Sequence, residues 1–134
     1  MSMKANELMI GDWVKHSITG KIGKVYRICD NEYIAFIDGD TRSELVEPIP
    51  LTPEILEKNG FNLEEAVEDY YFLYIGIDER VSLCNGEEFI DSDNKWDVCI
   101  DNEDHCTIAT YELTYVHELQ HILRLCKIDE EIVV

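Results

Sequence analysis

Two histidines and a glutamate near the end of the chain have the spacing of a zinc site. His117, Glu118 and His121 form the pattern H-E-x-x-H. On a helix the two imidazoles share a face and can bind one tetrahedral Zn²⁺, while the glutamate between them acts on the metal-bound water as general base. The motif raises the hypothesis of a zinc-dependent hydrolase, with His117 and His121 as ligands and Glu118 as the catalytic base.

A zinc hydrolase also needs a third protein ligand, and the sequence does not select one. The extended form of the motif would place glycine at position 124 and histidine at position 127. This chain has Arg124 and Lys127 there, and few residues follow His121. His105, Cys106 or an upstream carboxylate stays open as the third ligand. The missing partner weakens the zinc hypothesis.

The helix that should carry the motif has one apolar side, and the motif lies on the other. At about 100° per residue, the following residues gather on one side: Tyr115, Val116, Leu119, Ile122, Leu123 and Cys126. We therefore predict an amphipathic helix over residues 115–126 whose two histidines face solvent. No metal or cofactor is expected on this argument, no catalytic residue is assigned, and zinc at His117 and His121 is kept as the alternative.

The charge balance favours some partners over others. The chain has 134 residues, of which 46% are hydrophobic and 30% charged, so it can build a core of about one domain. Eleven Lys and Arg stand against 29 Asp and Glu, which gives a net charge of −18. The basic residues are scattered, which argues against direct nucleic-acid binding and against docking on an anionic membrane. A basic protein partner or a cation fits this charge.

The five cysteines and the start of the chain indicate the cellular compartment. The cysteine count is odd, and no C-x-x-C pair occurs. The first residues, MSMKANELMIGDWV, lack the apolar stretch of a secretory signal, and no apolar run is as long as a membrane span. We predict a cytoplasmic protein with reduced thiols, in which each cysteine is a small buried apolar residue.

The pattern of strands and helices predicts an α+β protein in two parts. Residues 1–51 contain short strand-like runs joined by tight turns, one of them near Gly20, which is typical of a small SH3-like β-barrel. For residues 52–134 the pattern predicts a helix, an antiparallel β-meander from Tyr70 onward and the C-terminal amphipathic helix. Pro48 to Thr52 marks the boundary between the two subdomains.

The helix after the barrel has clear start and stop signals. Thr52 is a suitable N-cap, and Pro53 suits the first helical position. Gly60 stands where a helix-ending glycine belongs, and it places Leu56 and Phe61 in contact. The sequence therefore predicts a short helix over residues 52–61, followed by either one more turn or an acidic loop.

Three segments together resemble a known family. They are MKANELMIGDWV at 3–14, EPIPLTPEILEKNGF at 47–61 and YVHELQH at 115–121. In order and phrasing the chain resembles a family of small uncharacterised proteins from Bacteroides-type bacteria and their phages and mobile elements. The resemblance implies a bacterial or phage protein of the cytoplasm, and it brings no activity with it.

These observations favour a non-catalytic function. We expect a small acidic interaction or adaptor module of phage or mobile-element origin, acting on a protein partner that is basic. Two alternatives stay open. One is the zinc hydrolase of His117, Glu118 and His121, and the other is a DNA mimic whose carboxylates imitate phosphates and occupy the basic site of a nucleic-acid enzyme.

Overall fold

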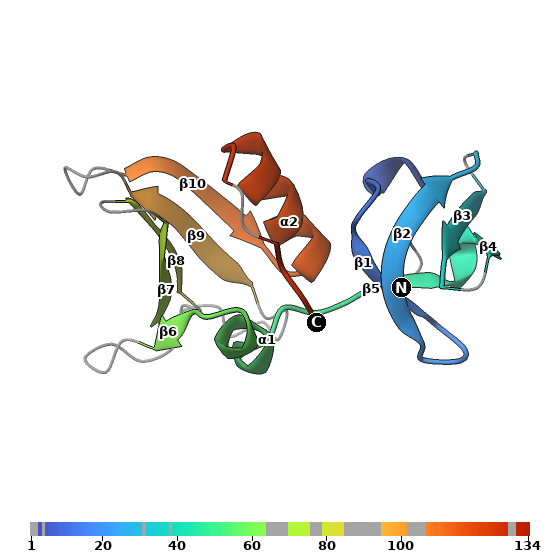
Figure 1. Cartoon of the computed structure of the whole chain (residues 1–134), viewed down its shortest axis with the longest axis horizontal. Helices are drawn as coiled ribbons and strands as arrows, with labels where there is room; N and C mark the ends of the chain where they lie inside the picture. The colour runs from blue at the N-terminus through green and yellow to red at the C-terminus, as the bar shows by residue number, and fades with distance from the viewer. Residues whose placement is uncertain are drawn as a thin grey trace. The chain divides into compact units, whose positions relative to one another are not determined.

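The computed structural model describes most of the chain. The described residues are 3, 5–30, 32–37, 39–63, 70–75, 79–84, 95–101, 107–128 and 131–134. They form two compact units, the first comprising residues 1–50 with 115–121 and the second comprising 51–114 with 122–134. Each unit contains one antiparallel sheet (Figure 1). The two subdomains predicted from the sequence, residues 1–51 and 52–134, would be units that fold independently. That division stays a prediction.

The first unit is built on five short strands. They are β1 (Trp13–His16), β2 (Ile22–Ile28), β3 (Tyr33–Phe36), β4 (Asp40–Arg42) and β5 (Val46–Pro48), with 3-10 turns η1 (Ala5–Glu7) and η2 (Ser43–Leu45). All described pairings are antiparallel, in the order β4-β3-β2-β1-β5. Together with the second unit this confirms the α+β class. As described, the sheet is open, since β4 and β5 are its two edges.

Alternating apolar residues give the first sheet its core. The buried cluster consists of Met3, Leu8, Val14, Val25, Ile34, Phe36 and Val46. The predicted turn before β2 is present, and Gly20 has a φ of +72°, a conformation that favours glycine. After β4 the chain makes the turn η2 and pairs with β1 only from Val46 onward.

The second unit is an antiparallel meander with helices. The helix α1 (Pro53–Lys58) precedes β6 (Asn62–Leu63), β7 (Tyr70–Ile75), β8 (Glu79–Cys84), β9 (Trp96–Asp101) and β10 (Thr107–Leu113). Helix α2 (Val116–Leu125) follows, and only its end, from Ile122 onward, belongs to this unit. The strand order is β10-β9-β8-β7-β6, which confirms the predicted meander. In its core the Trp96 indole donates to the Leu51 carbonyl at 3.1 Å. Residues 64–69, part of the segment predicted as a turn or loop, lie outside the described residues.

Helix α1 follows its predicted start and stop signals. The Thr52 hydroxyl accepts from the Ile55 amide at 3.3 Å and so caps α1. After α1, Gly60 has a φ of +85° and the Phe61 amide donates to the Leu56 carbonyl at 3.0 Å, the bond of a Schellman ending. Neither described helix is long and apolar enough to cross a membrane.

The prediction of buried cysteines is wrong for the described ones. Cys29 is exposed, and Cys84, Cys99 and Cys126 are half-buried. Cys29 lies just beyond the exposed end of β2, where its thiol donates to Asp40 at 3.2 Å. Cys106 lies outside the described residues. Although a cysteine side chain is apolar, Cys29 is exposed because the neighbouring end of β2 is exposed.

Candidate functional site

Helix α2 begins with a capping contact that uses the glutamate of the H-E-x-x-H motif. The helix starts at Val116, one residue later than predicted. The Glu118 carboxylate reaches back and accepts from the Tyr115 amide at 3.1 Å. This is the acidic half of a capping box, which satisfies an amide that the helix leaves without a carbonyl. Glu118, the residue proposed as the general base, therefore has a structural role as the acceptor for the Tyr115 amide.

Gln120 attaches the helix to the turn before β1. Its amide nitrogen donates to the Gly11 carbonyl at 2.9 Å, and its amide oxygen accepts from the Trp13 backbone at 3.0 Å. Only 7% of Gln120 is exposed. One side chain thus satisfies a backbone donor and a backbone acceptor across more than a hundred residues of sequence, which fixes the register of this end of α2 on the first unit.

His121 contacts a buried carboxylate beside the Gln120 bonds. Its Nε2 lies 2.6 Å from an Asp12 carboxylate oxygen that also accepts from the Met9 amide at 2.8 Å. The Asp12 side chain is 0% exposed and that of His121 is 25% exposed. A carboxylate buried this fully needs hydrogen-bond partners, and the imidazole supplies one of them.

His117 is buried and lies between two aromatic rings. It is 7% exposed, and its ring stacks on Tyr115 with centroids 5.9 Å apart and an interplanar angle of 15°. The His121 ring meets it edge-on at 5.5 Å. Burial lowers the pKa of His117 below its ordinary 6.5, against the carboxylates of Asp12, Glu118 and Glu7, which raise it. The ring is therefore neutral at physiological pH.

The prediction that both histidines face solvent is wrong. The apolar pattern correctly identified one packed side, where Val116 and Leu119 are fully buried. The opposite side also packs, but through polar groups: Gln120 binds backbone atoms and His121 binds Asp12. A pattern of apolar residues cannot reveal a face that is buried by hydrogen bonding. Arg124 and Lys127 are exposed as expected.

The two imidazoles are not arranged as a pair of metal ligands. Across the described ranges, no group of three or more His, Cys, Asp or Glu residues is placed to hold an ion. Nε2 of His121 is already in contact with the Asp12 carboxylate at 2.6 Å. Nδ1 of His117 has no hydrogen-bond partner among the described residues, whereas a ligating histidine usually donates its second N–H to an acceptor. His105 and Cys106, considered as third ligands, lie outside the described residues.

A cavity of about 410 Å³ opens beside the motif in the first unit. Its described lining residues are Met3, Glu7, Pro48, Tyr115, His117, Glu118 and His121. The volume falls within the roughly 300–1,000 Å³ typical of small-ligand pockets. Three residues of the sequence motif therefore line one hollow, together with residues from the N-terminal segment and β5.

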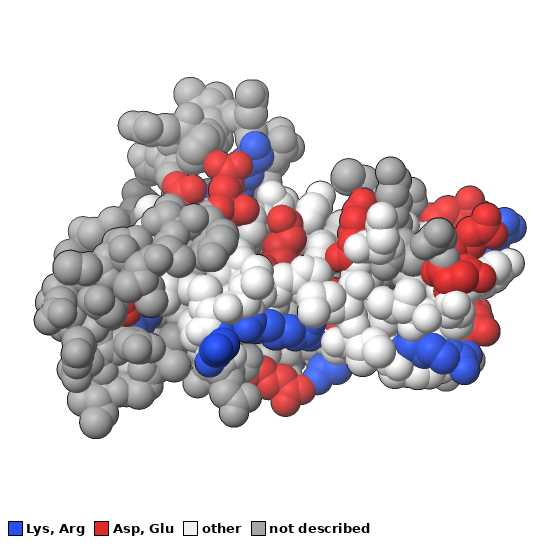
Figure 2. Space-filling view, turned by 90° about the horizontal axis from the view of Figure 1, so that it is seen from above, with Lys and Arg blue, Asp and Glu red and all other residues white. Residues whose placement is uncertain are grey.

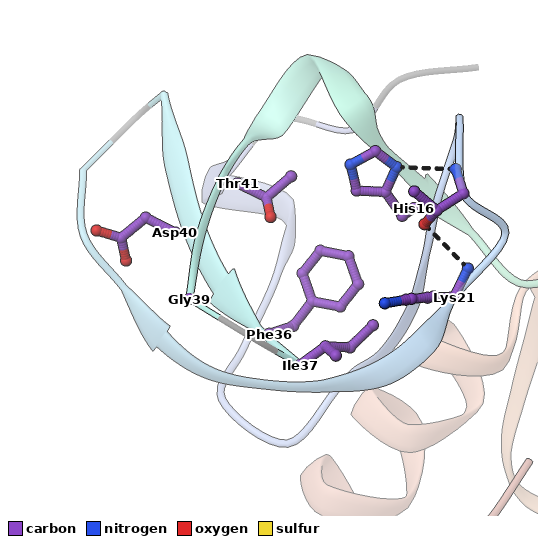
Figure 3. Close-up of a pocket in the computed structure, with 8 residues that line it drawn as sticks. His16, Lys21, Phe36, Ile37, Gly39, Asp40 and Thr41 are labelled. Carbon is purple, nitrogen blue, oxygen red and sulfur yellow. Dashed lines mark hydrogen bonds between the residues drawn. The ribbon is translucent and has the colours of Figure 1, made fainter.

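A second, smaller hollow of about 180 Å³ lies over the ring of Phe36 (Figure 3). The His16 ring lines it, and its Nδ1 accepts from the Ile18 and Thr19 amides at 3.2 and 3.3 Å. Figure 3 shows the Thr41 side chain pointing into the hollow, while the Asp40 side chain points away from it. Since Asp40 is paired with Arg27 at 2.6 Å, the hollow presents no free carboxylate from that residue.

The partners of the motif do not follow from the sequence pattern. Asp12 stands in the quoted segment 3–14 and Gln120 in the quoted segment 115–121, and neither position carries a sign of contact with the other. One signal was available: Gly11 and Asp12 form a turn before a strand, and such a turn leaves backbone groups to be satisfied. It could have indicated that polar side chains are needed there, but not which ones.

No family model, curated protein or solved structure matches the chain.

Proposed function

We propose that this protein is a small, acidic, non-catalytic interaction module that binds a basic protein partner. The observation that carries the proposal is the use of the H-E-x-x-H residues within the fold. Glu118 accepts from the Tyr115 amide, and His121 binds Asp12. A hydrolase would need these same groups available for metal and water, whereas a binding module is free to use them as structural contacts.

The N-terminal sheet supports a binding function through its architecture. We propose that it is an SH3-like barrel. The order β4-β3-β2-β1-β5, with every described pairing antiparallel and a 3-10 turn directly before β5, is the arrangement expected of that fold. Small barrels of this kind present loops and strand edges to partners, and they are compatible with many functions.

The charge supports a basic partner. The net charge is −18, and acidic side chains gather over the end of the first unit that carries β3 and β4 (Figure 2). A surface of one sign speeds encounter with a partner of the opposite sign and disfavours nucleic acid or an anionic bilayer. The resemblance of the three sequence segments supports an origin in Bacteroides-type bacteria or their mobile elements, and with it a cytoplasmic location.

A peptide-display selection combined with metal analysis tests the proposal. Selection from a random peptide library at physiological salt should enrich peptides rich in Arg or Lys, and their affinity should fall as salt rises. Purified protein should hold no zinc in stoichiometric amount. Enrichment of acidic or purely apolar peptides would contradict the basic partner. Stoichiometric zinc that is lost in both His117→Ala and His121→Ala would favour the hydrolase instead.

A further inference from the structure

The cavity beside α2 has an acidic and aromatic lining. Glu7 and Glu118 contribute carboxylates, and none of the described lining residues is Lys or Arg. Met3 and Pro48 contribute apolar surface. The combination of carboxylates with apolar walls suits a ligand that carries a cation on an alkyl stem.

The aromatic side of the cavity favours a flat cation. The rings of Tyr115 and His117 stack nearly parallel, at 15°. A planar guanidinium stacks on such rings and can donate to a carboxylate in the same plane, which a compact ammonium does less well. The aromatic and acidic lining therefore favours arginine over lysine.

The state of His117 agrees with a cationic ligand. The side chain is more than nine-tenths buried, and its Nδ1 lacks a partner among the described residues. A buried ring nitrogen left without a hydrogen bond destabilises the fold. Because burial lowers the pKa of His117, the neutral ring does not repel a positive charge, while Asp12, Glu118 and Glu7 act on the ring as negative neighbours.

We propose that this cavity receives an arginine side chain of the protein partner. The alkyl stem lies against Met3 and Pro48, and the guanidinium is held at the Tyr115–His117 rings by the charges of Glu7 and Glu118. This inference rests on the proposed function, since it names the group of the basic partner that is recognised. The inference assigns a binding role to the motif residues that line the cavity.

The first experiment uses small probes on the full chain. Arginine blocked at both ends as the N-acetyl amide is titrated into ¹⁵N-labelled protein, and blocked citrulline serves as the uncharged isostere. Blocked arginine should shift the amide resonances of Tyr115, His117 and Glu118 in a saturable manner, and citrulline should bind at least roughly tenfold more weakly. Equal binding of the two probes, or no shift at these residues, would overturn the inference.

The second experiment uses a pair of matched variants. Glu7→Gln removes one exposed carboxylate from the cavity rim, and Glu57→Gln removes an equally exposed one from α1. Glu7→Gln should weaken blocked arginine by roughly three- to tenfold, and Glu57→Gln should leave its affinity unchanged. Equal effects of the two variants would mean that only the overall charge matters, which contradicts the cavity.

The two proposals fail in different ways. If display selection enriches basic peptides but these leave the resonances of residues 115–121 unmoved, the basic partner stands and the cavity assignment is wrong. If blocked arginine binds at the cavity but no basic peptide is enriched, the protein binds free guanidinium compounds and the proposed interaction function is wrong.

Discussion

Gln120 offers the sharpest test of how the motif segment is used. In a zinc motif the position before the second histidine can be any residue, so Gln120→Ala should be tolerated. In the structure Gln120 makes two hydrogen bonds with Gly11 and Trp13. Each such bond contributes roughly 1 kcal/mol, and a backbone group left unsatisfied adds to the loss, so the variant should lose about 2–3 kcal/mol.

The assay must follow the first unit by itself, because the chain has two compact units and unfolding need not be two-state. A urea titration observed through the amide resonances of β1 to β5 gives the free energy of unfolding for that unit. The Trp13 amide, which donates to Gln120, should also exchange with solvent much faster in the variant.

A matched control separates this loss from the loss of any amide side chain. Asn6→Ala removes an exposed amide from η1 and should change stability by no more than about 0.5 kcal/mol. If Gln120→Ala also stays within about 0.5 kcal/mol of the parent, or the Trp13 amide stays protected, the attachment of α2 through Gln120 is refuted.

Four further predictions follow from single contacts. Glu118→Ala should cost about 1 kcal/mol in thermal unfolding, whereas Glu118→Gln keeps an oxygen for the Tyr115 amide and should cost less. Lys127 has a φ of +58° at the end of α2, where the Ile128 amide donates to the Leu123 carbonyl, so Lys127→Gly should stabilise by about 0.5–1 kcal/mol in urea unfolding; a loss would count against the strained ending. Because burial lowers the folded-state pKa of His117, the unfolded chain binds its proton more readily and stability should fall as the pH drops below 6.5; His117→Phe should flatten that slope in denaturation curves, and an unchanged slope would contradict it. Asp40 raises the pKa of the Cys29 thiol, so Asp40→Asn should speed alkylation of Cys29 by roughly two- to fivefold, measured by peptide mapping, and slower labelling would contradict this.

Local signals predicted the elements of the fold well. Thr52, Pro53 and Gly60 act at short range, and the structure shows the bonds that their chemistry implies. The antiparallel meander also follows from turns and alternation along the chain. Such features could be predicted because each is determined by residues within a few positions of one another.

The arrangement around the motif could not be predicted in the same way. Gln120 meets Gly11 and Trp13, and His121 meets Asp12, across more than a hundred residues. Hydrophobic periodicity assigns polar residues to solvent by default, and it has no means to detect a polar face that is buried through specific hydrogen bonds. The error on the two histidines has this origin.

Parts of three sequence segments, 3–14, 47–61 and 115–121, meet in the first unit. Residues 11–13 bind Gln120 and His121, and the Val116 amide donates to the Ile49 carbonyl at 2.9 Å. The start of α2, the turn before β1 and the end of β5 are therefore joined by one set of contacts. A fold requirement is a sufficient reason for these residue types to occur together.

That requirement does not extend to every polar group of the motif. Glu118, Gln120 and His121 each have a backbone or side-chain partner within the first unit. His117 is as deeply buried as Gln120, yet its Nδ1 has no such partner in the described part of the chain. Since buried polar atoms are almost always paired, the exception points to the cavity that His117 lines as the place to look for a ligand. We therefore propose that His117 contributes to a binding surface at this cavity.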